Sequence, residues 1–289
     1  MANSIQLSKV YTNLLDEVYQ QSALTAVLES DASLARQGAN ANEIVIPKLS
    51  MDGLADYSRN SGYVNGDVTL NWETVQFNYE RGRMFSVDNM DNEETQNIAF
   101  GRLAGEFIRT KVVPELDAFR FATYAATTGA GTATGTLTTG VDVIAALRKA
   151  TSDMDEAEVP MEDRHLFITP TLFGLVEDMD TTKSKEVLAR FASITKVPQT
   201  RFYSAIELLD GKTGGEEKGG YKKAELGVEL NFEIIHKPAT LQFTKHAVPK
   251  VISPELNQDA DAWKYGYRNY GLCDVYENKV AGIYVHKKA

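Results

Sequence analysis

The sequence predicts an α+β protein built from an extended ribbon, one long helix and a mixed α/β region. Residues 42–88 are rich in β-branched and aromatic side chains, which favour strands. Residues 91–127 carry apolar side chains at helical spacing. From residue 141 onward, strand-like and helix-like segments alternate, as they do in mixed domains.

The composition is that of a folded soluble protein with a sizeable core, since 43 % of the 289 residues are hydrophobic and 24 % are charged. Thirty Lys and Arg against 40 Asp and Glu give a formal net charge of −10 at pH 7. This balance argues against a dedicated nucleic-acid binder and against attachment to an anionic membrane surface. No apolar run reaches the roughly 18 residues that a membrane-spanning helix needs.

Cysteine content and the first residues indicate where the chain is made. Cys273 is the only cysteine, so an intrachain disulfide is impossible and a reducing compartment fits. The opening MANSIQLSKV lacks the basic and apolar regions of a signal peptide. We therefore expect a protein made in the cytoplasm.

Residues 1–40 are expected to form an N-terminal arm. Val10, Leu14 and Val18 recur at the spacing of an amphipathic helix, and the residues that follow are mostly small and polar. Both a frayed terminus and an arm that docks on a partner fit this pattern.

Residues 41–88 are expected to form a long β-hairpin. Two strand-like segments, Asn42–Ser50 and Asp67–Asp88, flank a polar connector that contains glycine. Strands of about fifteen to twenty residues reach roughly 50–65 Å, and an isolated two-stranded ribbon is only marginally stable in water. The ribbon should therefore pack against another surface, either in its own domain or on a neighbouring copy.

The second strand of this ribbon changes its side-chain alternation. Val68, Leu70 and Trp72 share one face, whereas Val75 and the apolar residues after it, as far as Val87, fall on the other. Such a change predicts a bulge, or a strand that meets different surfaces along its length.

Residues 91–127 are expected to form one helix of roughly 55 Å, long enough to cross the molecule. Asp91 is the expected N-cap, and Glu94 would complete a capping box. Pro114 should kink this helix or break it at Val113.

The rest of the chain reads as an α/β region followed by strands. The Gly/Thr-rich stretch 128–140 should end the long helix at a domain boundary, with Gly129, Gly131 and Gly135 acting as a hinge. Residues 207–220 have the composition of a flexible loop. We expect helices at 141–157, 172–179 and 184–191, and strands at 165–169, 231–237, 239–245 and 262–285.

No stretch of the sequence predicts a catalytic or metal site. The Gly-Lys-Thr at 211–213 has Ile206 where a phosphate-binding loop needs glycine. The Asn257–Arg268 segment resembles a calcium loop but carries Ala262 and Arg268 at positions that need glycine and glutamate. The four histidines lack zinc-ligand spacing. We therefore expect no enzymatic activity and no cofactor.

Three segments near the C-terminal end resemble major capsid proteins of tailed bacteriophages. They are PELNQDADAW (Pro254–Trp263), YGYRNYG (Tyr265–Gly271) and ENKVAGIYVH (Glu277–His286). The order of the expected elements is also similar to that family over nearly the whole chain. The resemblance implies the Hong Kong 97-type fold, in which an N-terminal arm and an extended loop precede a spine helix with a peripheral sheet and an axial α/β domain.

On this chain, the resemblance implies five parts with boundaries that follow the expected elements. The arm would span residues 1–40, the extended loop 41–88, the peripheral domain with its spine helix 89–140, and the axial domain 141–250. The C-terminal strands, residues 251–289, would return to the peripheral domain.

The resemblance also implies a function: self-assembly into the icosahedral head shell of a tailed double-stranded DNA bacteriophage. The protein would be made in the cytoplasm of the bacterial host and end in the virion, with no catalytic role and no membrane contact. Its expected partners are its own copies in hexamers and pentamers, a portal, decoration proteins, and DNA enclosed without sequence-specific binding. Two other readings are an encapsulin-type nanocompartment shell and a soluble α/β hydrolase or ligand-binding protein.

Two features found in some family members are not expected in this chain. Some members carry a large N-terminal scaffold segment, and forty residues before the ribbon are too few for one, so a separate scaffolding protein is expected. Others form a lysine–asparagine cross-link between subunits. Lys48 is the only lysine of the expected ribbon and lies near its base, so we do not expect such a cross-link here.

Charged residues on the ribbon and the long helix are the expected inter-subunit contacts. Arg81 and Arg83 share a strand face and would pair with acidic residues on an adjacent subunit's helix. Each such exposed pair is worth only about 0–1 kcal/mol, so it would set register more than hold the shell together. The candidate residues are Arg59, Arg81, Arg83, Glu93, Glu94, Arg102, Glu106 and Arg109.

Overall fold

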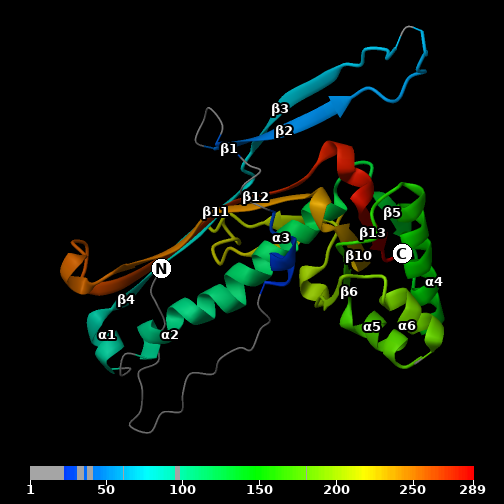
Figure 1. Ribbon diagram of the computed structural model, residues 1–289. Coiled ribbons are helices and arrows are strands. Elements are labelled where there is room, and N and C mark those ends of the chain that lie inside the picture. Colours follow the sequence, from blue (N-terminus) through cyan, green and yellow to red (C-terminus); the bar gives the residue numbers. More distant parts are fainter. Residues whose placement is uncertain (1–22, 31–35, 38–41, 61, 95–97, 180) are drawn as a thin grey trace.

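The computed structural model describes residues 23–30, 36–37, 42–60, 62–94, 98–179 and 181–289. It shows an elongated lobe, a compact lobe and a β-hairpin that projects from the elongated lobe (Figure 1). The helix expected around Val10 to Val18 lies outside the described residues. None of the helices in the described part of the chain is long and apolar enough to cross a lipid bilayer.

The elongated lobe is a three-stranded antiparallel sheet, in the order β11-β12-β4, with helices running alongside it (Figure 1). Aromatic contacts join the two layers, since Phe85 lies 4.8 Å from Phe107 and Tyr79 lies 4.8 Å from Phe119, centroid to centroid. The elements are β4 (Tyr79–Asp88), β11 (Thr240–Ile252), β12 (Ala262–Val275), α1 (Asn89–Glu94), α2 (Ile98–Phe107) and α3 (Val113–Ala125).

The compact lobe is a five-stranded mixed sheet in the order β5-β13-β10-β6-β7, covered by α4, α5 and α6. Every residue of its central strand, β10, is buried. The strands are β5 (Gly131–Thr134), β6 (Arg164–Ile168), β7 (Ser193–Lys196), β10 (Leu230–His236) and β13 (Ile283–Lys287), and the helices are α4 (Gly140–Glu156), α5 (Pro170–Glu177) and α6 (Thr182–Leu188). A small ribbon of β8 (Ile206–Leu208) and β9 (Tyr221–Lys223) stands beside the sheet.

The order helix, strand, helix, helix predicted between residues 141 and 191 is confirmed by α4, β6, α5 and α6. Thr139 starts α4 through a capping box with Asp142, because each side chain accepts from the other residue's backbone N–H. Pro170 ends the extended backbone of β6 and occupies the first position of α5, where its missing N–H costs nothing.

The hairpin consists of β2 (Glu43–Met51) and β3 (Val68–Gln76), with the short β1 (Arg36–Gln37) beside β2. The second arm expected at Asp67–Asp88 is two strands, because β3 pairs with β2 whereas β4 pairs with β12. The change of alternation after Trp72 falls inside β3, whose pairing with β2 is unbroken as far as Gln76. It marks a change of surface, because Leu70 and Trp72 are exposed whereas Val75 packs against an apolar cluster of the three-stranded sheet, as one of the two predicted explanations requires.

The long helix differs from the prediction at its start and at its proline. Asp91 is not the N-cap: it lies inside α1, and the Asp88 carboxylate accepts from the Met90 N–H at 2.9 Å. The chain also stays helical through Pro114, so the predicted break at Val113 is wrong. The preceding turn, Ile108–Val112, widens into a π-helix in which Val113 N–H donates to the Ile108 carbonyl.

The Gly/Thr-rich stretch after α3 is part of the sheet and not a free hinge. Gly131–Thr134 forms β5, which pairs in parallel with β13. Glycine is required at position 131 because a Cβ there would lie 2.5 Å from Cδ2 of Tyr284.

Two apolar clusters fill the compact lobe, one on each face of its sheet. Phe232 of β10 belongs to the cluster under α4 and α5, and Ile235 belongs to the cluster under α3. In the second cluster, Phe121 of α3 meets Phe167 and Phe202 edge-on, each at 5.1 Å. Helix α3 thus belongs to both lobes, because its other side packs on the three-stranded sheet.

The substitution Phe121→Ala should lower the free energy of unfolding by about 3–5 kcal/mol, because it leaves a cavity beside the rings of Phe167 and Phe202. Urea denaturation followed by circular dichroism measures this loss. The control is Val141→Ala on α4, whose side chain is 63 % exposed and which should change stability by less than about 0.5 kcal/mol. Equal losses in the two variants would contradict the assignment of Phe121 to the core.

Candidate inter-subunit surface

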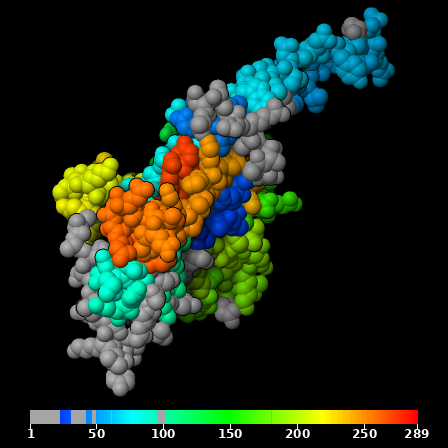
Figure 2. Space-filling view, turned by 90° about the vertical axis from the view of Figure 1, so that its left-hand side faces the viewer, coloured from blue at the N-terminus to red at the C-terminus, as the bar shows by residue number. Residues whose placement is uncertain are grey.

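The hairpin carries the largest group of exposed apolar side chains in the described part of the chain. Eight of the eighteen large apolar side chains that are exposed there lie between residues 51 and 72: Met51, Leu54, Tyr57, Tyr63, Val64, Val68, Leu70 and Trp72. In Figure 2 the hairpin stands clear of the body. Single exposed apolar residues are normal in soluble proteins, whereas the concentration of eight on one projecting hairpin makes it a candidate interaction surface.

The pairing of β2 with β3 puts part of this group on one face. Met51 lies opposite Val68, and Leu70 and Trp72 follow at two-residue steps on the same face of β3. Lys48 lies opposite Asn71, within the paired part of the ribbon and outside its tip.

The base of the hairpin is anchored on its own subunit. Ile44 and Ile46 are buried in a cluster with Leu241, Phe243 and Leu272 of the three-stranded sheet. The ribbon was expected to pack either on its own domain or on a neighbouring copy. The base of the hairpin packs on its own domain. The outer part has no such cover among the described residues.

The tip of the hairpin is preorganised by local contacts. Tyr57 and Tyr63 lie with ring centroids 4.8 Å apart, and a backbone bridge joins Ser58 to Gly62, which adopts a positive φ of 80°. Arg59 is exposed within this turn. Tyrosine and arginine at a protruding tip are typical of binding hot spots, and the paired tyrosine rings lose little conformational entropy when they are covered.

Arg81 and Arg83, expected to face a neighbour, are bound within their own chain. Nε of Arg81 lies 2.7 Å from Oε1 of Glu115 on α3. Its Nη2 donates to the carbonyls of Leu209 and Gly220 at 2.8 and 3.2 Å. Arg83 donates from Nη1 and Nη2 to two further carbonyls of the same loop, both at 2.9 Å.

The candidate residues on the helices divide into paired and exposed ones. Glu106 and Arg109 form an ion pair with each other, one turn apart on the helix. Arg102 is half-buried and also interacts within the chain. Glu93 and Glu94, at the end of α1, are exposed, so they and Arg59 are the candidates that a neighbour could reach most directly.

A second feature of α3 is a buried carboxylate, Asp117, which is fully inaccessible to solvent. Its Oδ1 accepts from the Thr25 N–H at 3.2 Å and the Thr25 hydroxyl at 2.8 Å, and both oxygens lie 3.1 Å from the Leu24 nitrogen. Nη1 of Arg201 lies 3.1 Å from Oδ2. This network fixes the segment 24–28 and the turn around Arg201 to α3.

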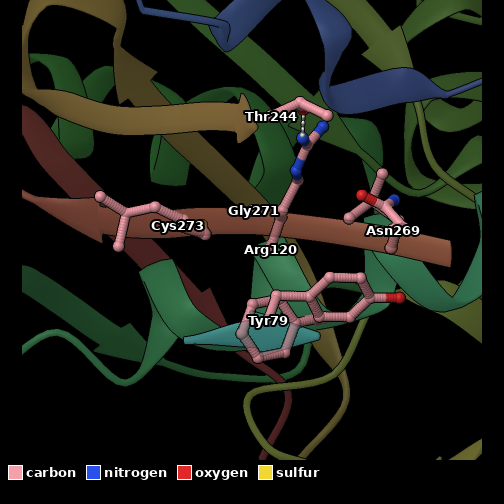
Figure 3. Close-up of a pocket in the computed structure, with 9 residues that line it drawn as sticks. Tyr79, Arg120, Thr244, Asn269, Gly271 and Cys273 are labelled. Atoms are coloured by element: carbon pink, nitrogen blue, oxygen red, sulfur yellow. Dashed lines mark hydrogen bonds between the residues drawn. The ribbon is translucent and has the colours of Figure 1, made fainter. Parts of the chain in front are cut away.

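A small gap beside this network separates α3 from the three-stranded sheet (Figure 3). Arg120 projects across it and donates to the hydroxyls of Thr25 and Thr244 at 3.0 and 3.4 Å. Cys273 lines the same gap, and burial raises the pKa of its thiol to about 12. The thiol is therefore protonated near neutral pH, which does not suit a nucleophile.

The buried histidines have structural contacts. His165 shares a 2.6 Å hydrogen bond between Nδ1 and Oγ of Ser193, and burial lowers its pKa. His286 stacks on Phe232 at 4.9 Å and lies 3.0 Å from Nδ2 of Asn231. Within the described residues, no group of three or more His, Cys, Asp or Glu side chains could hold a metal ion.

Solved capsid structures have the same architecture over nearly the whole chain. The capsid of bacteriophage PhiM1 is 12 % identical with a TM-score of 0.64, covering 99 % of this chain and 92 % of that one. The capsid structure of cyanophage P-SCSP1u is 13 % identical with a TM-score of 0.63, covering 98 % and 93 %. The chain has the capsid fold of tailed bacteriophages.

A structure from Mycobacterium phage Che8 agrees, with 13 % identity, a TM-score of 0.62, and 99 % and 98 % of the two chains covered. No protein-family model and no curated protein sequence matches the chain. At this level of identity the structures establish the fold. The Hong Kong 97-type capsid fold expected from the C-terminal segments is confirmed.

Replacing Asp117 with Asn should destabilise the capsid fold by about 3–5 kcal/mol, because it removes the buried negative charge that lies beside the Arg201 guanidinium and accepts from Thr25. Chemical denaturation gives the value. The matched control is Glu207→Gln, which removes an exposed ion pair with Lys222 and should cost at most about 1 kcal/mol. A loss of that small size for Asp117→Asn would show that the network is not essential.

Glu233 of β10 should make stability depend on pH. Both its carboxylate oxygens are buried without a hydrogen-bond partner, and burial raises its pKa well above 4.5. Because the folded-state pKa is raised, its stabilising contribution is complete below the unfolded pKa and is lost as pH rises through the folded one.

Glu233→Gln should therefore leave the free energy of unfolding nearly unchanged near pH 4, where Glu233 is protonated in the folded state. At about pH 9 the substitution should raise the free energy of unfolding by more than about 1 kcal/mol, since one pKa unit corresponds to about 1.4 kcal/mol. Thermal denaturation at both pH values measures the difference. A gain that is the same at both would exclude titration of Glu233 as its cause.

Proposed function

We propose that this chain is the major capsid protein of a tailed double-stranded DNA bacteriophage and assembles with copies of itself into the icosahedral head. The observation that carries the proposal is the projecting hairpin, which exposes eight large apolar side chains on a chain with the capsid fold. Burying one large apolar side chain contributes about 1.5–3 kcal/mol. A neighbouring copy that covers the hairpin would recover much of this free energy.

In the proposed shell, apolar burial supplies cohesion and charged residues set register. Arg59 at the hairpin tip and Glu93 and Glu94 at the end of α1 are exposed and of opposite charge. Exposed pairs of this kind contribute about 0–1 kcal/mol each but steer the approach of two surfaces. They are therefore suited to selecting one arrangement of subunits from several that would bury a similar surface area.

The proposed assembly places this subunit in hexamers and pentamers, formed with a separate scaffolding protein and completed by a portal and decoration proteins. The role is structural and non-catalytic, and the final location is the virion. A net charge of −10 supports enclosure of DNA without tight binding, because DNA binding draws on excess positive charge.

Deleting residues 55–66 should give a folded subunit that no longer assembles, because the tip adds little to its own core. The variant and the wild type would be co-expressed with the candidate scaffolding protein and compared by size-exclusion chromatography and negative-stain microscopy. We expect closed shells for the wild type and a drop of at least about tenfold in the number of shells for the deletion, because every contact that involves the tip would be lost.

The matched control is Val141→Ser, which replaces an exposed apolar side chain on α4 away from the hairpin and should assemble normally. Thermal unfolding of the deletion variant should remain cooperative. Normal shells from the deletion variant would refute a role of the hairpin tip in assembly. Loss of cooperative unfolding would instead show that the tip packs within its own subunit.

A further inference from the structure

The loop Leu209–Gly220, between β8 and β9, is a braced turn in contact with the elongated lobe. The Asp210 carboxylate accepts from the backbone N–H groups of Lys212 and Thr213 at 2.7 and 2.8 Å and from the Thr213 hydroxyl at 2.6 Å. These bonds lower the pKa of Asp210 to about 2. The composition predicted a flexible loop, but these contacts give it a defined shape, visible as the yellow projection in Figure 2.

This loop belongs to the compact lobe by its base. A bridge joins Tyr203 to Glu229 beside β10, and Leu230 N–H donates to the carbonyl of Phe202, whose ring is in the core under α3. The Tyr221 hydroxyl donates to the Thr200 carbonyl at 2.8 Å. Motion of the loop base is therefore coupled to the compact lobe.

The far side of the loop is held by two arginines of β4, in the elongated lobe. Arg81 donates to the carbonyls at the two ends of the loop, Leu209 and Gly220, and Arg83 donates to those of Glu217 and Lys218. Arginine suits this task because its planar guanidinium presents several N–H donors in fixed directions. Four carbonyls of one lobe are thus held by two side chains of the other.

The contacts that the two arginines make with the loop differ in charge pairing and in exposure to solvent. Arg81 is also ion-paired with Glu115, whose side chain is 10 % exposed, so releasing it would leave a largely buried carboxylate unpaired. The bonds of Arg83 are exposed to solvent and go to neutral carbonyls. Water can replace the bonds of Arg83 far more easily than those of Arg81, which makes local opening there less costly.

Gly219 shows that the fit around Arg83 is specific. Its φ of +63° disfavours any side chain, and a Cβ there would lie 3.0 Å from Nη1 of Arg83. The backbone must approach the guanidinium closely for its carbonyls to accept. Arg83 is two residues after Arg81 on β4, and a strand rises by about 3.4 Å per residue, so the two arginines contact the loop at points about 7 Å apart.

We propose that loop 209–220 is a releasable clasp between the two lobes, with Arg81 as its fixed point and Arg83 as the half that opens. When Arg83 is bound, the loop holds β4 against the compact lobe at two points and resists rotation of one lobe against the other. When Arg83 is released, the loop pivots on Arg81. The subunit thereby has a closed and an open form without loss of either core.

The test uses unassembled subunits, so it is independent of any shell. Trypsin cleavage after Lys212 and Lys218, both in the loop, reports its opening. Arg83→Ala should raise the rate of cleavage at both sites about fivefold or more, because local opening becomes more frequent. The control Arg190→Ala removes an exposed arginine at the end of α6 and should leave the rate unchanged.

Two further variants keep the result interpretable. Arg83→Lys retains the charge but not the planar fork, and should give an intermediate rate even if Arg83→Ala folds poorly. Gly219→Ala should reproduce the effect of Arg83→Ala from the other side of the contact. Hydrogen exchange should show faster exchange at residues 211–219 and no change in β10. Wild-type cleavage rates in Arg83→Lys and Gly219→Ala would overturn the clasp, as would faster exchange across β10.

Discussion

The buried carboxylate of Asp117 is the constraint on which the arrangement of the subunit depends. A charge with no exposure to solvent is costly unless its oxygens accept several hydrogen bonds and a cation lies beside it. Asp117 satisfies this requirement with donors from the segment 24–28 and from Arg201. Because few other arrangements would satisfy it, the network selects one relation among α3, the first described segment and the compact lobe.

Helix α3 extends this constraint to both lobes. One side contributes Phe121 to the core of the compact lobe, and Tyr124 on the same helix donates its hydroxyl to Gln242 of β11 at 2.9 Å. Arg120 reaches Thr244 on the same strand. The helix therefore packs against both sheets, so a change in its position would alter the packing of each of them.

Much of the fold could be predicted from local patterns, since α4, β6, α5 and α6 follow from periodicity and proline placement. The partners of the long-range contacts could not. Asp117 lies 84 residues from Arg201 and 92 from Thr25, and no pattern in the sequence links them. In the same way, the change of side-chain alternation after Trp72 indicated a change in surface, but no local sequence pattern identified β12 as the strand that pairs with β4.

The candidate surface was predictable only in part, for a physical reason. Exposed apolar side chains on a long hairpin follow from the pattern of residues 42–76, and the structure has them. Arg81 and Arg83 were expected to need acidic partners on another subunit. Their main acceptors besides Glu115 are backbone carbonyls, which every residue carries and which therefore leave no trace in a sequence.

The position of β13 has a consequence for synthesis of the subunit. This strand, Ile283–Lys287, lies between β5 and β10, so the five-stranded sheet cannot close until residues near 287 have left the ribosome. Pairings between residues so far apart in the chain form slowly, because a large loop must close first. A nascent or prematurely terminated chain thus leaves the edge of β10 that pairs with β13 uncovered, and exposed strand edges of this kind make incomplete chains prone to aggregation.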